Sequence, residues 1–299
     1  MTFKRLIFII GITGFVFAFF SQAQAQKTME SDQQISEFSL AGYGDKGKKS
    51  WDIAGKSADI FTDVVKLNDV NGNLYGKEEN INLTAEKGDF NKTDGKVHLE
   101  KNVVITTSSG TKMTTDTLDW DRKNQLVTTE DTVNIQRDNM VTVAKGARGE
   151  PNLKKVALEK EVRVDINPVD TPGTEDTGTK EKITIICDGP LQIDYEKNIA
   201  TFNNNVKVDR ADSVIYSDKM DVYFGKQTAQ AANSPGAMAM GSSIDKIVAR
   251  GNVKIVRGEN VSYSDEAIYS AADKKLILNG RPRLLIYSAE DFKNASIGN

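Results

Sequence analysis

The chain has 299 residues, with 39 lysines and arginines against 42 aspartates and glutamates, and a formal net charge of −3. That balance argues against a protein that binds nucleic acid electrostatically, because such proteins present a basic surface. One cysteine allows no internal disulfide, and one histidine leaves no metal site rich in cysteine or histidine. A hydrophobic content of 38% and an aromatic content of 7% are typical of half-buried strands and too low for a polytopic membrane protein.

Residues 1–25 have the features of an export signal. Two basic residues open the segment, residues 6–20 are almost all apolar, and Ala23 and Ala25 are spaced as in a cleavage site. We expect a secretory signal that is removed. The alternative is a retained membrane anchor, because the apolar run is short for a membrane span but its flanks can lengthen it. In both cases the rest of the chain is exported.

The sequence repeats every 30 residues from Ile81 onward. The blocks 81–110 and 111–140 place chemically similar side chains at matching positions, as Phe90 and Trp120 do. A third block starts at Val141, and its matching residues come one position earlier than a spacing of 30 would place them, since Leu99 and Leu158 are 59 residues apart. Such internal repeats indicate one supersecondary unit used several times.

A second repeat appears farther along the chain. Asn205-Val-Lys-Val recurs as Asn252-Val-Lys-Ile at a spacing of 47 residues, and Tyr216-Ser-Asp recurs as Tyr263-Ser-Asp at the same spacing. The extra length of this unit is mostly residues 226–243, which we interpret as a long loop or hairpin extension.

Within each unit the apolar residues alternate with polar ones. Val97 and Leu99 show the period of two that is typical of a strand with one buried face. Three pairs have the composition of tight turns: Asn71-Gly72, Asp94-Gly95 and Gly251-Asn252. No segment after residue 26 keeps a helical period over a dozen positions, so the sequence predicts an all-β chain.

Residues 167–182 interrupt this pattern. The segment has two prolines, two glycines and four threonines and no aromatic residue, which is typical of a linker. We therefore expect a first domain over residues 26–166, a linker over 167–182 and a second domain over 183–299.

The second half contains four motifs, which are Ile185-Ile-Cys-Asp-Gly-Pro-Leu191, Ala200-Thr-Phe202 leading to Asn205-Val206, Tyr216-Ser-Asp218 and Ala249-Arg-Gly-Asn-Val253. With these motifs, residues 183–287 resemble the OstA-like domain of the lipopolysaccharide-transport protein LptA. The first half resembles LptC, with a short apolar segment at its start followed by Trp51-Asp-Ile-Ala-Gly-Lys-Ser-Ala58. One chain would then hold in tandem two modules that are usually separate polypeptides.

This resemblance implies two tandem open antiparallel β-jellyroll (β-taco) domains of repeated short strands, each with an apolar interior and an open seam. It implies a non-enzymatic periplasmic protein, with no cofactor, metal or catalytic residue, that binds lipopolysaccharide or a similar acylated lipid. The implied partners are an inner-membrane ABC transporter complex and other LptA-like or outer-membrane bridge proteins. Edge strands could also join copies head to tail into a homo-oligomer.

An apolar trough suits acyl chains, because moving each methylene out of water gains about 0.8 kcal/mol and needs no directional group. We expect the head group to stay outside the seam. The alternating positions supply the groove candidates, although such residues are more often plain core than ligand contacts. They are Ile53, Leu83, Phe90, Leu99, Val103, Ile105, Met113, Trp120 and Ile135 in the first half, and Phe202, Val206, Val208, Met220, Val222, Phe224, Val253, Ile255 and Leu278 in the second.

Two further features complete the expected site. Phe90 and Trp120, at the same repeat position, are expected to stack over one another in the trough, although aromatic pairs also stabilise sheets. The strand after Pro282 is the expected edge for assembly. Its candidate residues are Leu284, Leu285, Ile286 and Tyr287.

Other chemistry has less support. The carboxylates Asp116, Asp119, Asp121, Asp218 and Asp221 recur at repeat positions, where turn capping and solvated edges explain them better than glycoside hydrolysis. We expect His98 to be an exposed strand residue, and Cys187 to be a buried free thiol.

A second interpretation of the repeats is an exported structural or adhesive β-solenoid with a closed core and no ligand. The spacings of 30 and 47 residues fit hairpin units better than solenoid coils of about 20–29 residues.

Overall fold

The computed structural model describes residues 31–44, 47–76, 79–137, 139–151, 153–167, 182–224, 244–273 and 275–287. These described residues all belong to one unit. The expected signal segment 1–25, all but the two ends of the expected linker 167–182, and the expected loop 226–243 lie outside the described residues. Among the residues that are described, no helix is long and apolar enough to span a membrane.

The described chain is a succession of strands. They are β1 (Gln33–Tyr43), β2 (Lys49–Ile60), β3 (Val64–Tyr75), β4 (Asn80–Asn91), β5 (Lys96–Thr107), β6 (Lys112–Asp121), β7 (Leu126–Arg137), β8 (Met140–Gly149), β9 (Lys155–Ile166), β10 (Ile183–Cys187), β11 (Leu191–Asp194), β12 (Ile199–Arg210), β13 (Ser213–Phe224), β14 (Ile244–Arg257), β15 (Asn260–Ser270), β16 (Lys275–Asn279) and β17 (Arg283–Leu285). The predicted all-β class, with a sheet of many short antiparallel strands, is confirmed.

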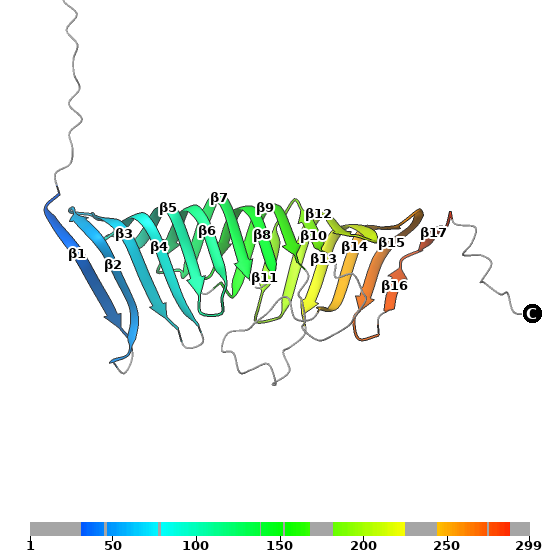
Figure 1. Ribbon diagram of the computed structural model, residues 1–299, viewed down its shortest axis with the longest axis horizontal. Coiled ribbons are helices and arrows are strands. Elements are labelled where there is room, and N and C mark those ends of the chain that lie inside the picture. The colour runs from blue at the N-terminus through cyan, green and yellow to red at the C-terminus, as the bar shows by residue number, and fades with distance from the viewer. Residues whose placement is uncertain are drawn as a thin grey trace, which may run out of the picture. The chain divides into compact units, whose positions relative to one another are not determined.

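The strands follow one another across a single antiparallel sheet, mostly in chain order (Figure 1). Each repeat is a pair of antiparallel strands, because β5 and β7 start 30 residues apart at Lys96 and Leu126. The register of β7 with β8 and of β8 with β9 continues the same up-and-down pattern. The 30-residue spacing therefore measures two crossings of the sheet.

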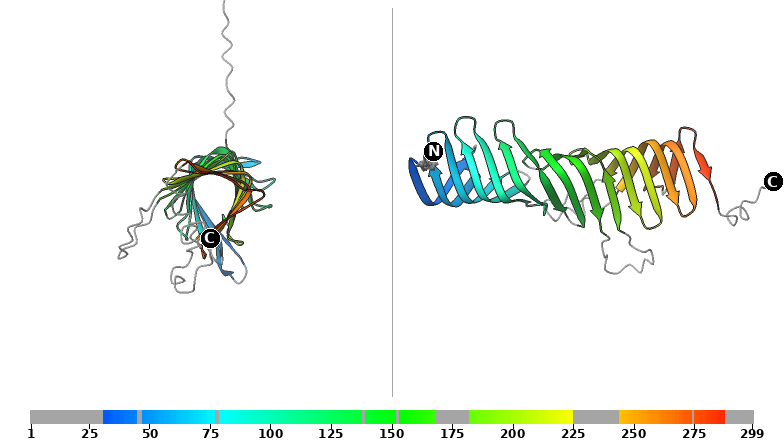
Figure 2. Two further views of the ribbon diagram at one scale, coloured as in Figure 1. Left: turned by 90° about the vertical axis from the view of Figure 1, so that its right-hand side faces the viewer. Right: turned by 90° about the horizontal axis from the view of Figure 1, so that it is seen from above.

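A crease runs across the middle of the strands and folds the sheet over. Lys101 and Asn102 in β5, and Asn204 and Asn205 in β12, have positive φ values. The ladder shifts register at the same level, for example between Glu100 and Val103. A mid-strand bulge bends its strand and increases its twist. Because the bulges are aligned, the whole sheet curls, as Figure 2 shows along the row of strands.

At two places the crease breaks a strand in two. β10 and β11 are separated by Asp188, Gly189 and Pro190, and both pair with β9 on one side and β12 on the other. In the same way β16 and β17 both pair with β15. Each of these short pairs therefore fills one strand position in the sheet.

Two of the three predicted tight turns are wrong. Asp94-Gly95 does lie in the turn between β4 and β5, but Asn71-Gly72 lies inside β3 and Gly251-Asn252 lies inside β14. Gly251 and Asn252 have positive φ values and form the crease of β14. The same left-handed conformation is used in hairpin turns and in bulges, so the composition alone did not separate them.

The two halves of the chain are joined by strand pairing. Ile166 of β9 lies opposite Ile183 of β10, and Leu158 of β9 lies opposite Leu191 of β11. The sheet is therefore continuous from the first half into the second, whatever path residues 168–181 take. The division into two domains remains a prediction.

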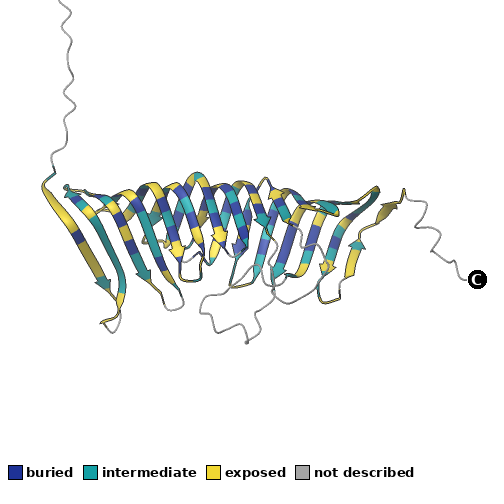
Figure 3. Ribbon diagram, viewed as in Figure 1, coloured by how far each residue is buried: buried dark blue, intermediate teal, exposed yellow. Residues whose placement is uncertain are grey.

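The core follows the concave face of the sheet. Leu99, Leu118 and Leu158 in the first half and Leu191 and Phe202 in the second are each at most 1% exposed. Figure 3 shows buried positions recurring on successive strands, whereas β1 and β17 are mostly exposed. One apolar core thus extends across the joint between the halves.

Candidate functional site

The concave face of the curled sheet contains the residues predicted to line the groove. Most of these are buried: Leu99, Val103, Ile105, Met113, Ile135, Phe202, Val206, Val208, Met220, Val222 and Val253. The others are only partly buried: Ile53, Leu83, Phe90, Trp120, Phe224, Ile255 and Leu278. The alternation correctly placed all of them on one face, but it did not separate core from accessible surface.

In several strands burial decreases from the crease toward one end, whereas β5 and β7 stay buried up to their last residues, Thr107 and Arg137. In β14, Ala249 and Val253 flank the crease and are buried, whereas Ile247 and Ile255, farther out on the same face, are partly exposed. In β6, Leu118 is buried and Trp120, nearer the strand end, is partly exposed. The apolar side chains accessible to a ligand therefore lie near those strand ends that are only partly buried.

The strand ends form two rims. We call the edge where β5 and β7 end, at Thr107 and Arg137, the first rim. The edge where β5 and β9 begin, at Lys96 and Lys155, is the second rim. Trp51 of β2 also lies at the first rim, because it is opposite Leu74, which is next to the last residue of β3.

Arg122 makes one contact between the rims. It follows β6 at the second rim, and its guanidinium lies 5.9 Å from the ring centroids of Trp51, Phe90 and Trp120. Trp51 belongs to the first rim and the other two rings to the second. Cation–π contacts of this kind are worth about 0.5–1 kcal/mol at exposed sites.

Phe90 and Trp120 lie on alternate strands of the concave face, and their stacking remains a prediction. Val97 of β5 lies between them as the cross-strand partner of both. Their strands are therefore about 9–10 Å apart, twice the spacing of neighbouring strands. The two rings share Arg122 instead of a direct cross-strand pairing.

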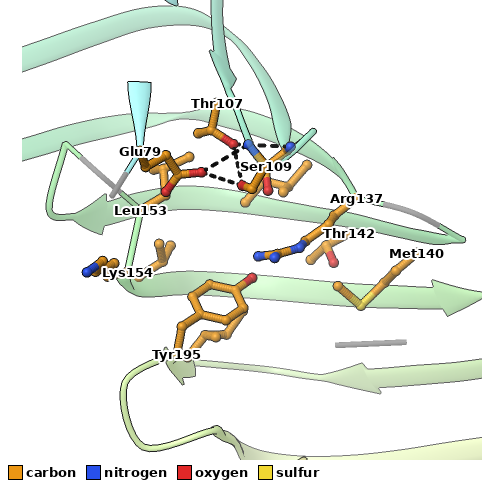
Figure 4. Close-up of a pocket in the computed structure, with 13 residues that line it drawn as sticks. Glu79, Thr107, Ser109, Arg137, Met140, Thr142, Leu153, Lys154 and Tyr195 are labelled. Atoms are coloured by element: carbon orange, nitrogen blue, oxygen red, sulfur yellow. Dashed lines mark hydrogen bonds between the residues drawn. The ribbon is translucent and has the colours of Figure 1, made fainter. Parts of the chain in front are cut away.

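A second contact between the rims lies beside the joint of the two halves. Arg137, at the end of β7 on the first rim, lies 5.0 Å from the ring centroid of Tyr195, which follows β11 on the second rim. Both residues line a cavity of about 80 Å³, and Figure 4 shows their side chains next to one another. Sequence reasoning missed this pair, although Arg137 continues the inward series Val133 and Ile135 and so was a detectable exception to an apolar pattern.

Hydroxyl groups and one carboxylate line the first-rim side of this cavity. The Ser109 hydroxyl donates to the Glu79 carboxylate, and the Ser109 backbone N–H lies 3.4 Å from the same oxygen. The Thr107 and Ser109 hydroxyls are 2.8 Å apart, and the backbone N–H of Thr111 donates to Thr107 at 3.2 Å. The hydroxyls and Glu79 thus form one hydrogen-bonded group (Figure 4).

Two protein-family models match the chain. A model described as "Lipopolysaccharide-assembly, LptC-related" matches residues 6–167, and one described as "LptA/(LptD N-terminal domain) LPS transport protein" matches residues 190–296. The chain belongs to the LptC-related lipopolysaccharide-assembly family. The predicted resemblance of the two halves to LptC and to LptA is confirmed. No curated protein matches the chain.

Membership of this family gives the general function. Lipopolysaccharide transport is the process in which both matched families act, and their members are non-enzymatic periplasmic bridge proteins. The interpretation as a structural or adhesive β-solenoid is not favoured. Consecutive strands pair antiparallel, which also differs from the parallel coils of a solenoid.

The two edges of the sheet expose large apolar side chains. Leu40 of β1 is 58% exposed, and Leu276 of β16 and Leu284 of β17 are 50% and 59% exposed. β17 ends at Leu285, so Ile286 and Tyr287 of the predicted edge strand lie beyond its end. The Tyr287 backbone N–H donates to the Asn260 side chain at 3.1 Å, which holds this exposed segment against β15.

The recurring carboxylates have structural partners. Asp121 accepts hydrogen bonds from the Asn124 backbone and side chain, which lower its pKa, and this confirms turn capping. Asp218 accepts from Asn252 at the crease at 2.8 Å. Asp221 was expected at a solvated edge but is buried, where it accepts from Thr201 at 2.8 Å and from Arg250 at 2.6 Å.

The remaining single residues are also accounted for. Cys187 is a buried free thiol, as predicted, and burial raises its pKa. His98 is partly exposed on the outer face, with its Nδ1 2.7 Å from Asp119 and its Nε2 3.2 Å from Glu100. The hydrogen bond to Asp119 raises the pKa of His98. Asp116 is exposed on β6.

Proposed function

We propose that this chain is a periplasmic bridge component that holds lipopolysaccharide, or a similar acylated lipid, by its acyl chains on the concave face of the sheet. The observation that supports this most strongly is the continuity of the apolar face through the pairing of β9 with β10 and β11. A lipid could therefore move from the first half to the second without leaving an apolar surface.

The partly exposed positions toward the rims are the proposed lipid contacts. Trp120, Phe224, Ile255 and Leu278 pack against the core and keep part of their surface accessible. Phe90, opposite Val97 on the same face, is also partly exposed. Acyl chains laid along them would cover this surface, gaining about 25 cal/mol for each Å² of apolar area removed from water. The fully buried candidates would then support the groove from behind.

The exposed edges are the proposed joints to partners. β1 would face the inner-membrane ABC transporter complex, and β16 with β17 would face another LptA-like unit, an outer-membrane bridge protein or a second copy of this chain. An unpaired strand edge accepts a further strand through its free backbone groups. The exposed leucines at both edges would be covered by such pairing. If residues 1–25 are retained, they would also tether the chain to the inner membrane.

Site-specific photocrosslinking in lipopolysaccharide-producing cells tests the groove. A photoreactive residue at Phe90 or at Ile255 should crosslink to lipopolysaccharide, because both positions are on the concave face and partly exposed. The matched controls are Asp89 and Lys254, the preceding residues on the same strands, which point to the outer face. Crosslinks at the controls as strong as at the two test positions would contradict the proposal.

A further inference from the structure

The cavity between Arg137 and Tyr195 is unusual for an apolar trough, because it contains ionic and hydroxyl groups. It lies at the seam beside the joint of the two halves, and both rims contribute to it. Its ionisable lining residues include Arg137, Lys154 and Glu79 (Figure 4). A groove that held only acyl chains would have no need for a guanidinium at this position, since burying a charge is costly.

Arg137 is a charged residue on the inward-facing side of β7. It ends the inward-facing series of β7 after Val133 and Ile135, and only 6% of its surface is exposed. The ring of Tyr195 lies against the guanidinium. When the flat face of a guanidinium stacks on a ring, its N–H groups point outward in the plane of the group. This planar fork matches two oxygens of a phosphate or carboxylate.

The surroundings of Arg137 suit an oxyanion. The buried hydroxyl residues Thr107, Thr111 and Thr142 line the same cavity, and Lys154 adds a second positive charge from the opposite rim. The hydroxyl of Ser109 engages the carboxylate of Glu79 on the first-rim side. A water molecule needs about 10–15 Å³ of such volume, so a cavity of about 80 Å³ has room for a small tetrahedral group.

The second rim contributes Leu153, Lys154 and Tyr195 to the cavity wall. Leu153 lines the cavity with a φ of 56°, in the left-handed region that side chains disfavour. The carbonyl of Lys154 accepts a hydrogen bond from the Tyr195 backbone N–H at 2.9 Å. This hydrogen bond places Lys154 and Tyr195 side by side at the cavity.

We infer that this cavity is an anion subsite that receives a phosphate of the lipid head group as the lipid passes from the first half to the second. The inference rests on the proposed function, because the acyl chains would have to lie in the groove below. It adds a determinant to that function: the chain would distinguish a phosphorylated acylated sugar from the same lipid without phosphate. Arg137 would bind the phosphate directly, and Tyr195 would position Arg137.

Equilibrium binding of the full chain to lipid A, and to the same lipid with its phosphates removed, tests the subsite. The wild-type chain should bind the phosphorylated form about tenfold more tightly, the factor that corresponds to one charge-assisted contact. Arg137→Gln should abolish this preference and leave the affinity for the dephosphorylated lipid unchanged. The matched control is Arg163→Gln, which removes an exposed arginine on the outer face of β9 beside the same joint and should keep the preference.

The outcomes separate the subsite from the proposed function. Binding of neither lipid would overturn the groove itself, whereas equal binding of both by the wild-type chain would overturn only the subsite. If Arg137→Gln fails to fold, Arg137→Lys replaces it, because lysine keeps the charge and lacks the planar fork. A several-fold weaker preference in this variant supports the subsite, and an unchanged preference contradicts it.

Discussion

The crease and the rims of this sheet are built from the same alternating strands, but they differ in what they leave exposed. At the crease of β5, Leu99 and Val103 are each only 1% exposed, so they pack as an ordinary protein core. Toward the rims, Phe90 and Ile255 on the same concave face stay partly exposed. The comparison indicates that only part of the apolar face is available to a ligand.

This difference decides which substitutions can test lipid binding. A charge placed at Phe202 or Val253, which are both about 1% exposed, would be buried in the core and would unfold the sheet. A charge at Phe90 or Ile255 can remain in contact with water. Only the rim positions therefore separate loss of lipid from loss of fold.

Shortening a leucine should give the largest difference between crease and rim. Leu99→Ala removes a fully buried side chain and should lower the free energy of unfolding by about 2–5 kcal/mol. Leu83→Ala, at a partly exposed position of the same face, should cost about 1–2 kcal/mol. Urea unfolding measures both. Equal losses would show that crease and rim are packed alike.

The second prediction concerns the backbone of the crease. Asn252 has a φ of 47° and donates a hydrogen bond to Asp218 at 2.8 Å. Asn252→Ala should destabilise the protein by roughly 1–2 kcal/mol, because alanine is disfavoured in this conformation and cannot donate. Asn252→Gly is the control, since glycine tolerates the conformation and should lose less stability. An alanine variant as stable as the glycine variant would contradict this role of the crease.

The third prediction moves from the rims to the exposed edges. Leu40→Lys in β1 and Leu276→Lys in β16 should each weaken head-to-tail assembly, because lysine on an edge strand opposes strand addition. Since both leucines are at least half exposed, unfolding should change by no more than about 0.5 kcal/mol. Sedimentation over a range of protein concentrations measures the assembly. Assembly unchanged in both variants would remove the edges from the proposed joints.

The smallest expected effect is a pH dependence on the outer face. The hydrogen bond to Asp119 raises the pKa of His98, so protonated His98 stabilises the fold. This stability is fully present below the unfolded pKa of about 6.5 and is lost as the pH rises through the folded value. Exposed ion pairs contribute about 0.2–1 kcal/mol. The difference in urea midpoint between pH 5.5 and pH 8.5 should shrink in Asp119→Asn, and an unchanged difference would exclude this pair as its source.

Much of the fold could be predicted because its determinants are local. Val97 and Leu99 show the period of a half-buried strand, and the pairing of similar residues 30 positions apart gives the two-strand repeat. The crease was not predicted, because Gly251-Asn252 has the same composition in a mid-strand bulge as in a turn. The choice between them depends on the neighbouring strands.

The candidate site was predictable only in part. The alternation of side chains along each strand predicted which face the apolar candidates occupy, because successive residues of a strand point to opposite faces. The meeting of Arg137 with Tyr195, or of Arg122 with Trp51, depends on how far the whole sheet curls. Such contacts join residues far apart in the sequence, and no local pattern indicates them.

The most direct test of the account is mass spectrometry of the lipid extracted from the full chain after purification from a lipopolysaccharide-producing host. We predict stoichiometric acylated lipid with the wild-type protein. The lipid should be lost in the double variant Phe90→Asp with Ile255→Asp, whose circular dichroism and thermal midpoint should stay close to the wild type. An extract free of acylated lipid from a fully stable wild-type protein would contradict the proposed groove.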